Sequence, residues 1–159
     1  MRKLRSVAAC ALTLGAMSGG VLIGIISAGA QAEPILVDLT AGRATFLDFG
    51  GDGNIERGDR LTGRSPVVDP TSGDRVGISF GDCIAMTRIV VEQSKGAWVC
   101  THVLALADGH IILQGEDPAG PGPYVLAVTG GTGPYKDARG EAEAVDVEDR
   151  TEITIHLEP

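Results

Sequence analysis

The chain has 159 residues, of which 43% are hydrophobic and only 4% aromatic, and its formal net charge at pH 7 is −8. An acidic surface repels nucleic acid and anionic membranes, and no basic cluster with interleaved aromatic residues is present, so we expect neither as a partner. The length is enough for one domain with one hydrophobic core.

The first 32 residues have the features of a secretory signal peptide. Arg2, Lys3 and Arg5 form a positive start, a glycine-broken apolar stretch follows, and residues 30–32, Ala-Gln-Ala, fit the small-x-small cleavage rule. We predict cleavage after residue 32, one mature domain at 33–159, and a secreted, extracellular protein without a membrane anchor. The alternative, a retained anchor, is disfavoured by the glycines in the apolar stretch.

The mature part consists of short apolar or alternating segments separated by turns rich in glycine, proline and acids. After a lead-in at 33–43, we expect strands at 43–49, 60–69, 75–91, 97–107, 110–115, 124–128, 141–147 and 150–157. No amphipathic helix of useful length interrupts them. This pattern predicts an all-β fold, and about eight strands suit a single antiparallel β-barrel that holds one small ligand.

Cysteine and histidine usage bears on disulfides and metals. Cys10 leaves with the signal peptide, so Cys83 and Cys100 remain as an even pair in an oxidising compartment, and we predict one disulfide between them. The three histidines are scattered along the sequence, so we expect no metal site and no cofactor. The acidic loop at 50–59 invites a calcium interpretation, but it lacks the EF-hand spacing and flanking helices.

The stretch 128–141 carries four glycines: Gly130, Gly131, Gly133 and Gly140. A phosphate-cradling loop would need a strand before it and a long helix after it, and here a second strand-like run follows. We therefore interpret these glycines as a structural turn between two strands.

Residues 130–140, Gly-Gly-Thr-Gly-Pro-Tyr-Lys-Asp-Ala-Arg-Gly, resemble the signature turn of the dirigent proteins and the allene oxide cyclases. Shorter pieces continue the resemblance in the same order: Gly58-Asp59, 73–78, Gly81, Cys83, 108–111, 114–115 and 125–131. The resemblance implies an eight-stranded antiparallel barrel with a lipocalin-like ligand cavity.

The resemblance also implies a class of function. Allene oxide cyclases act on an epoxide, dirigent proteins guide the coupling of radicals, and small bacterial barrels resembling this superfamily act as [4+2] cyclases in polyketide pathways. We therefore expect a cofactor-independent cyclase or isomerase in natural product biosynthesis that takes a hydrophobic small molecule. The alternative is a non-catalytic stereochemical guide, small-molecule binder or structural extracellular protein. A homo-oligomer, dimer or trimer, is among the expected partners.

Five residues are candidates for the lumen, and no catalytic constellation stands out. Asp48 resembles the first-strand aspartate of the dirigent proteins. Trp98 and His102 share one face of a strand and line the lumen if that face points inward; otherwise they are surface and packing residues. Arg64 is either a paired inward cation or solvent-exposed, and Tyr124 either rims the mouth or plugs the barrel end. We leave open whether Arg139 serves the cavity or the turn.

Overall fold

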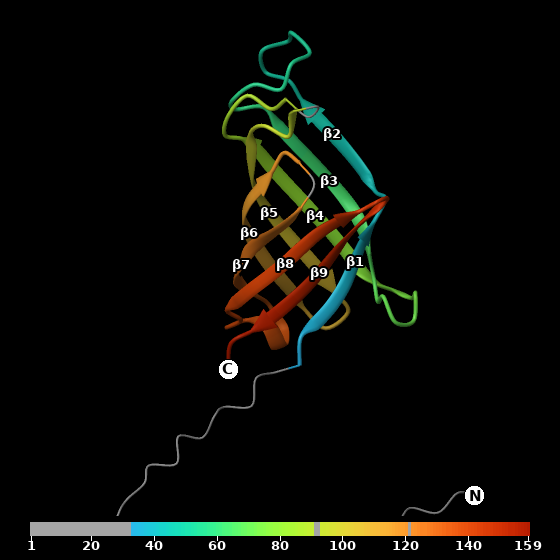
Figure 1. Ribbon diagram of the computed structural model, residues 1–159. Helices are drawn as coiled ribbons and strands as arrows, with labels where there is room; N and C mark the ends of the chain where they lie inside the picture. Colours follow the sequence, from blue (N-terminus) through green and yellow to red (C-terminus); the bar gives the residue numbers. More distant parts are fainter. Residues whose placement is uncertain (1–32, 91–92, 121) are drawn as a thin grey trace, which may run out of the picture.

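The computed structural model describes residues 33–90, 93–120 and 122–159, so the predicted signal peptide lies outside the described residues. These residues form one sheet in the spatial order β1-β9-β8-β7-β6-β5-β4-β3-β2 (Figure 1). The strands are β1 (Ile35–Thr40), β2 (Arg43–Leu47), β3 (Arg60–Val68), β4 (Arg75–Ala85), β5 (Ala97–Leu106), β6 (His110–Pro118), β7 (Pro123–Gly131), β8 (Gly140–Val147) and β9 (Arg150–Leu157). Within the described ranges, no helix has the length and apolar character to span a membrane.

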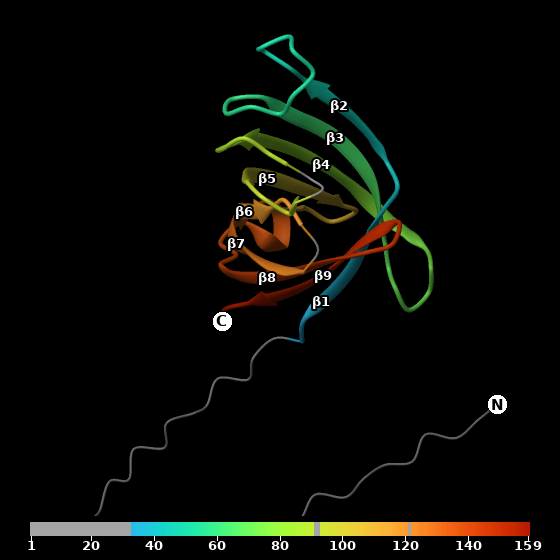
Figure 2. The same ribbon diagram turned by 45° about the horizontal axis from the view of Figure 1, so that its top comes forward.

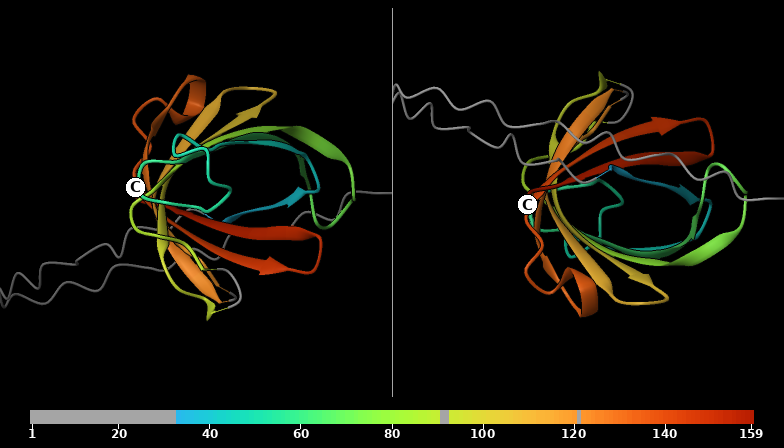
Figure 3. Two further views of the ribbon diagram at one scale, coloured as in Figure 1. Left: turned by 90° about the horizontal axis from the view of Figure 1, so that it is seen from above. Right: turned by 90° about the horizontal axis from the view of Figure 1, so that it is seen from below.

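The sheet closes on itself because β1 and β2 are two halves of one bent strand. β1 pairs with β9 along its whole length and also meets β3 at Asp38↔Val68 and Leu39↔Val67. β2 then continues along β3, from Arg43↔Arg64 onward. Counting the two halves as one, the chain is a closed eight-stranded antiparallel barrel, which confirms the predicted fold (Figures 2 and 3).

Alternation along the strands places the hydrophobic core at one end of the barrel. The core cluster takes buried residues of one parity from each of β5 to β9: Leu104, Ile111, Leu113, Leu126, Val128, Ala142, Ala144, Ile153 and Ile155. Towards the other end, the inward face of these strands and of β3 and β4 carries small or polar residues that line a cavity: Gly63, Gly81, His102, Asp117, Tyr124 and Thr151. The barrel is therefore packed at one end and hollow towards the other.

Strand β6 is longer than the sequence pattern predicted. Pairing with β5 continues to Trp98↔Asp117 and Ala97↔Pro118, whereas we expected the strand to end at Gly115. The acids and the proline of this segment resemble a loop in composition. The alternation nevertheless persists, because Gly115 and Asp117 share the inward face of Ile111 and Leu113.

The glycine-rich turn joins β7 to β8 through a short 3-10 turn, η2 (Gly133–Tyr135). Gly130, Gly133 and Gly140 have φ values of 147°, 62° and 142°, a region that side chains disfavour. A Cβ on Gly131 would lie 2.1 Å from the carbonyl oxygen of His110. Arg139 is exposed, and its Nη1 donates to the carbonyl of Ala138, so its contacts belong to the turn.

Candidate functional site

A cavity of about 590 Å³ enters the hollow end of the barrel. One side is formed by the bend between β1 and β2 together with β3 and β4, and the other by the β8–β9 turn. His102, Asp117 and Tyr124 lie between these sides, and we call these three residues the cavity floor. Gly63, Ser79 and Gly81 contribute little side-chain volume to the wall, which leaves room for a small ligand.

Asp117 of β6 is the unusual acid of the floor. Its carboxyl group is half-buried, and burial, reinforced by the nearby charge of Asp146, raises its pKa to about 6. Near neutral pH this group therefore exists in both protonation states. It can donate a hydrogen bond to a ligand oxygen or accept a proton, which is the behaviour required of a general acid or base.

Tyr124 of β7 supplies a phenol beside that acid. Burial raises its pKa, and the negative charges of Asp117 and Asp146 raise it further. The hydroxyl of Thr151 donates a hydrogen bond to the carboxylate of Asp146 at 2.7 Å. Because its pKa is raised, the phenol of Tyr124 stays protonated across the physiological range and is available as a hydrogen-bond donor.

His102 of β5 completes the floor. Burial lowers the pKa of its imidazole, so the neutral ring predominates at neutral pH. The ring lies over Gly81 of the neighbouring strand β4, where a Cβ would come within 3.1 Å of Nδ1. The missing side chain at position 81 therefore gives the imidazole its space.

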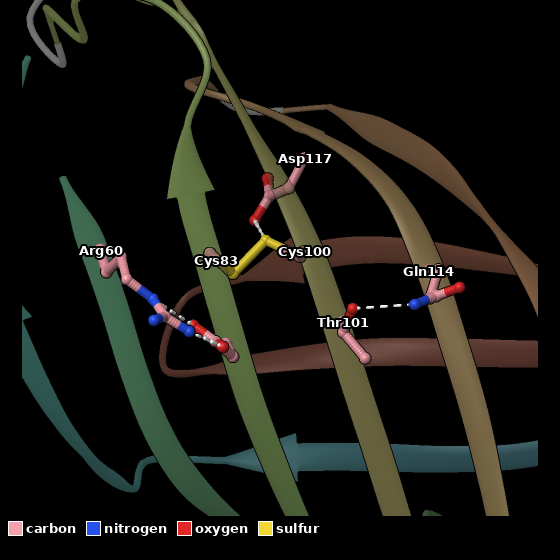
Figure 4. The surroundings of a disulfide bond; sticks show 7 residues. Arg60, Cys83, Cys100, Thr101, Gln114 and Asp117 are labelled. Atoms are coloured by element: carbon pink, nitrogen blue, oxygen red, sulfur yellow. Dashed lines mark hydrogen bonds and ion pairs between the residues drawn. A yellow bond between two sulfur atoms is a disulfide. The ribbon is translucent and has the colours of Figure 1, made fainter. Parts of the chain in front are cut away.

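A disulfide joins Cys83 of β4 to Cys100 of β5, two residues directly opposite one another with Cα atoms 4.0 Å apart. Both cysteines are buried on the inward face, and Cys83 lines the cavity. Asp117 reaches the bond from the next strand, with a carboxylate oxygen 3.9 Å from Sγ of Cys100 (Figure 4). The disulfide therefore forms part of the cavity wall, next to Asp117.

The structure brings together some of the residues chosen from the sequence. His102 and Tyr124 line the cavity. Trp98 lies on the same inward face as Cys100, directly opposite Asp117 in the register, although it does not line the cavity itself. Arg64 borders the cavity but is exposed, since it lies opposite Phe80 on the outer face of the barrel.

The expectation that Asp48 points into the lumen is wrong. Strand β2 ends at Leu47, one residue earlier, and the carboxylate of Asp48 accepts hydrogen bonds from the amides of Gly51 at 2.6 Å and Gly53 at 2.8 Å. Local amides capture a short acidic side chain at the end of a strand because it reaches them without ordering any other segment. Asp48 therefore shapes the loop after β2.

Sequence reasoning missed Asp117 and Asp146. Asp146 shares the parity of the buried Ala142 and Ala144 on β8, so extending the alternation by one step would have found it. Asp117 was assigned to a loop, and only its pairing with Trp98 shows which way it faces.

No family model matches the chain, and no curated protein matches it. Among solved structures, a pyocyanin demethylase aligns with a TM-score of 0.67 and 24% identity over 79% of this chain and 99% of its own. AbnU, an exo-specific intermolecular Diels–Alderase, aligns at 0.53 and 18% identity over 79% of this chain and 98% of its own. The Diels–Alderase AbmU from Streptomyces koyangensis aligns at 0.57 and 16% identity over 83% of this chain and 72% of its own.

The chain shares the fold of these small β-barrel enzymes. At these identities the likeness concerns the fold, and the specific relation to the allene oxide cyclases and dirigent proteins stays a prediction.

Proposed function

We propose that this protein is a cyclase or isomerase that needs no cofactor, binds a hydrophobic reactive intermediate in its cavity and steers its cyclisation, for example a [4+2] cyclisation in polyketide biosynthesis. The observation that carries the proposal is Asp117, a carboxyl group with a pKa near 6 that faces a cavity of about 590 Å³. Structural neighbours that are Diels–Alderases support the reaction class.

The cavity would act first by confinement. Folding a flexible polyene so that its reacting carbons approach one another removes much of the entropic part of the barrier, and a well-oriented near-attack geometry can contribute several kcal/mol. The aliphatic side chains of Leu61, Leu126 and Ile153 line the same cavity and would hold the apolar body of such a substrate.

The floor would act second, on a polar group of the substrate. Protonated Asp117 and the phenol of Tyr124 are two hydrogen-bond donors from adjacent strands that face one cavity. Directed at a carbonyl conjugated to the reacting double bond, they would withdraw electron density from it and stabilise the polarised transition state. The neutral imidazole of His102 would help to position the same group.

Turnover is tested with a panel of linear compounds that carry a conjugated diene and an activated enone. Product of unchanged mass is resolved by chiral chromatography and mass spectrometry. We expect faster formation of one stereoisomer with wild type, and slower formation with Asp117→Asn and Tyr124→Phe. Glu143→Gln, on the exposed face of β8, is the matched control and should leave the rate unchanged. A background rate and racemic product with every compound that binds would refute the catalytic proposal.

Binding is measured separately through Trp98, the single tryptophan of the chain, which lies opposite Asp117. Quenching of its fluorescence by panel members that are not turned over would favour the alternative, a non-catalytic stereochemical guide or binder. Pyocyanin belongs in the panel because a demethylase named for it shares the fold. Its binding with loss of a methyl group would replace cyclisation by demethylation as the activity.

A further inference from the structure

The sulfur atoms of Cys83 and Cys100 lie close to the imidazole of His102, one of the three residues of the cavity floor. Cys83, Cys100 and His102 each offer one ligand atom, and these three atoms all lie within 4.8 Å of one another. Cys100 and His102 are two residues apart on the inward face of β5, and Cys83 is the direct partner of Cys100 on β4. The chain spacing alone indicated no metal site, because the pairing of β4 with β5 is what creates this group.

Asp117 adds a fourth donor from a third strand. Its carboxylate oxygen lies 3.9 Å from Sγ of Cys100. In a tetrahedral zinc site with Zn–S bonds of about 2.3 Å and Zn–O bonds of about 2.1 Å, a sulfur and an oxygen ligand lie about 3.6 Å apart. The oxygen is therefore already near the separation that a shared ion requires, and two sulfurs, one imidazole and one carboxylate suit zinc-like ions.

We propose that reduction of the Cys83–Cys100 disulfide turns this corner of the cavity into a binding site for a zinc-like divalent cation, with Cys83, Cys100, His102 and Asp117 as ligands. A dithiol reductant transfers two electrons and two protons to the disulfide and is itself oxidised to a disulfide. The cation then displaces the two thiol protons and forms two metal–sulfur bonds. While the disulfide is closed, neither Cys83 nor Cys100 offers a thiolate, so the disulfide and a metal bound at this site exclude each other.

The surroundings suit such a site. The four ligands come from three adjacent strands of a closed sheet, which fixes their backbones. Gly81 leaves room for the imidazole to turn, and the cavity, lined by Cys83, His102 and Asp117, provides the entry path. A bound cation would be coordinated by Asp117, and the carboxyl group could then no longer donate a hydrogen bond to the substrate of the proposed cyclase.

Co²⁺ is the probe, because its spectrum reports both thiolate ligation and geometry. The Cys10→Ser chain is reduced with a phosphine, which takes up oxygen from water as it delivers the two thiols, and is desalted without air before titration. We expect a single Co²⁺ per chain with thiolate charge-transfer bands, visible bands of tetrahedral intensity, and displacement by Zn²⁺. The oxidised protein should show none of these, and equal binding by the oxidised form would overturn the proposal.

Ligand identity is tested by variants that keep both cysteines. His102→Gln and Asp117→Asn should each weaken Co²⁺ binding by roughly 10-fold to 100-fold or more. His110→Gln, which removes an exposed imidazole at the start of β6, is the matched control and should bind like wild type. Circular dichroism checks the fold of each variant. A folded His102→Gln variant with unchanged affinity and spectrum, or a wild-type spectrum without thiolate bands, would refute the site. Both readouts are independent of turnover, so the outcome does not depend on the proposed cyclase activity.

Discussion

The carboxylate oxygen of Asp117 lies 3.9 Å from the sulfur of Cys100, a residue 17 positions earlier in the chain. This contact connects an acid whose protonation changes near pH 6 to one half of a disulfide, within a cavity that also contains His102 and Tyr124. A change in the charge of Asp117 or in the oxidation state of the two cysteines therefore affects the same cavity. The effects of pH and of reduction on stability and on ligand binding can be compared in one set of variants.

Asp117 makes the stability of the protein fall as the pH rises. Its pKa in the folded state, about 6, exceeds the ordinary value of 3.8, so between these pH values the folded state holds a proton that the unfolded state has lost. Asp117→Asn removes the buried charge at high pH. At pH 8 we expect the free energy of unfolding to rise by about 1–2 kcal/mol, after allowance for solvent screening of a half-buried group.

Urea denaturation of wild type and Asp117→Asn at pH 4 and pH 8 measures this effect. The two proteins should differ little at pH 4, where the carboxyl group is mostly neutral in the folded wild type, and should separate at pH 8. A variant that is less stable than wild type at both pH values would show that Asp117 is held as a charged structural group instead.

Because Cys83 and Cys100 form a disulfide, we expect neither to react as a free thiol. In a Cys10→Ser chain, denatured without reductant, no thiol should react with a maleimide, and both Cys83 and Cys100 should react after reduction. Replacing both with alanine should lower the free energy of unfolding by roughly 3 kcal/mol, the chain-entropy value for a closed loop of this length. Two reactive thiols before reduction would mean that the purified protein carries the dithiol form.

Gly140 should tolerate no side chain. Its φ is 142°, and a Cβ would lie 1.9 Å from the carbonyl oxygen of His156 on β9. We expect Gly140→Ala to cost more than about 1 kcal/mol, measured by thermal and urea denaturation, because both the strained φ and the strand contact oppose it. The control is Gly50→Ala in the loop after β2, where the nearest atom would be 3.5 Å away and little change is expected. Equal stability of the two variants would contradict a structural role for the turn.

Asp59 should be a structural acid. It is 2% exposed, and its two carboxylate oxygens accept hydrogen bonds from the amides of Phe49 at 2.9 Å and Glu56 at 2.7 Å. Asp59→Ala leaves both amides without this partner and should cost about 2–3 kcal/mol. Asp52→Ala, which removes one exposed bond to the amide of Asn54, should cost far less. A similar loss for both substitutions would show that the loop, and not the buried acid, sets the stability.

The sequence by itself determined the class of the fold and several local features. Period-two alternation is a property of each segment, so it located most strands and showed that Trp98, Cys100, His102 and Leu104 share one face, but not that this face points inward. The dense glycines at 130–140 indicated a turn for the same reason, since positive φ values at Gly133 and Gly140 are a local backbone requirement.

Only the tertiary structure decided which polar groups meet. The neighbours of Asp117 depend on the pairing of β6 with β5, and the group formed by Cys83, Cys100 and His102 depends on the register of β4 against β5. Asp48 is an example in which the alternation misled. Its position in the alternation predicted an inward side chain, but β2 ends one residue earlier and the amides of Gly51 and Gly53 bind its carboxylate. The physical reason is that a strand's faces follow from its own backbone, whereas a cavity requires strands distant in sequence to pair in one register and close a barrel.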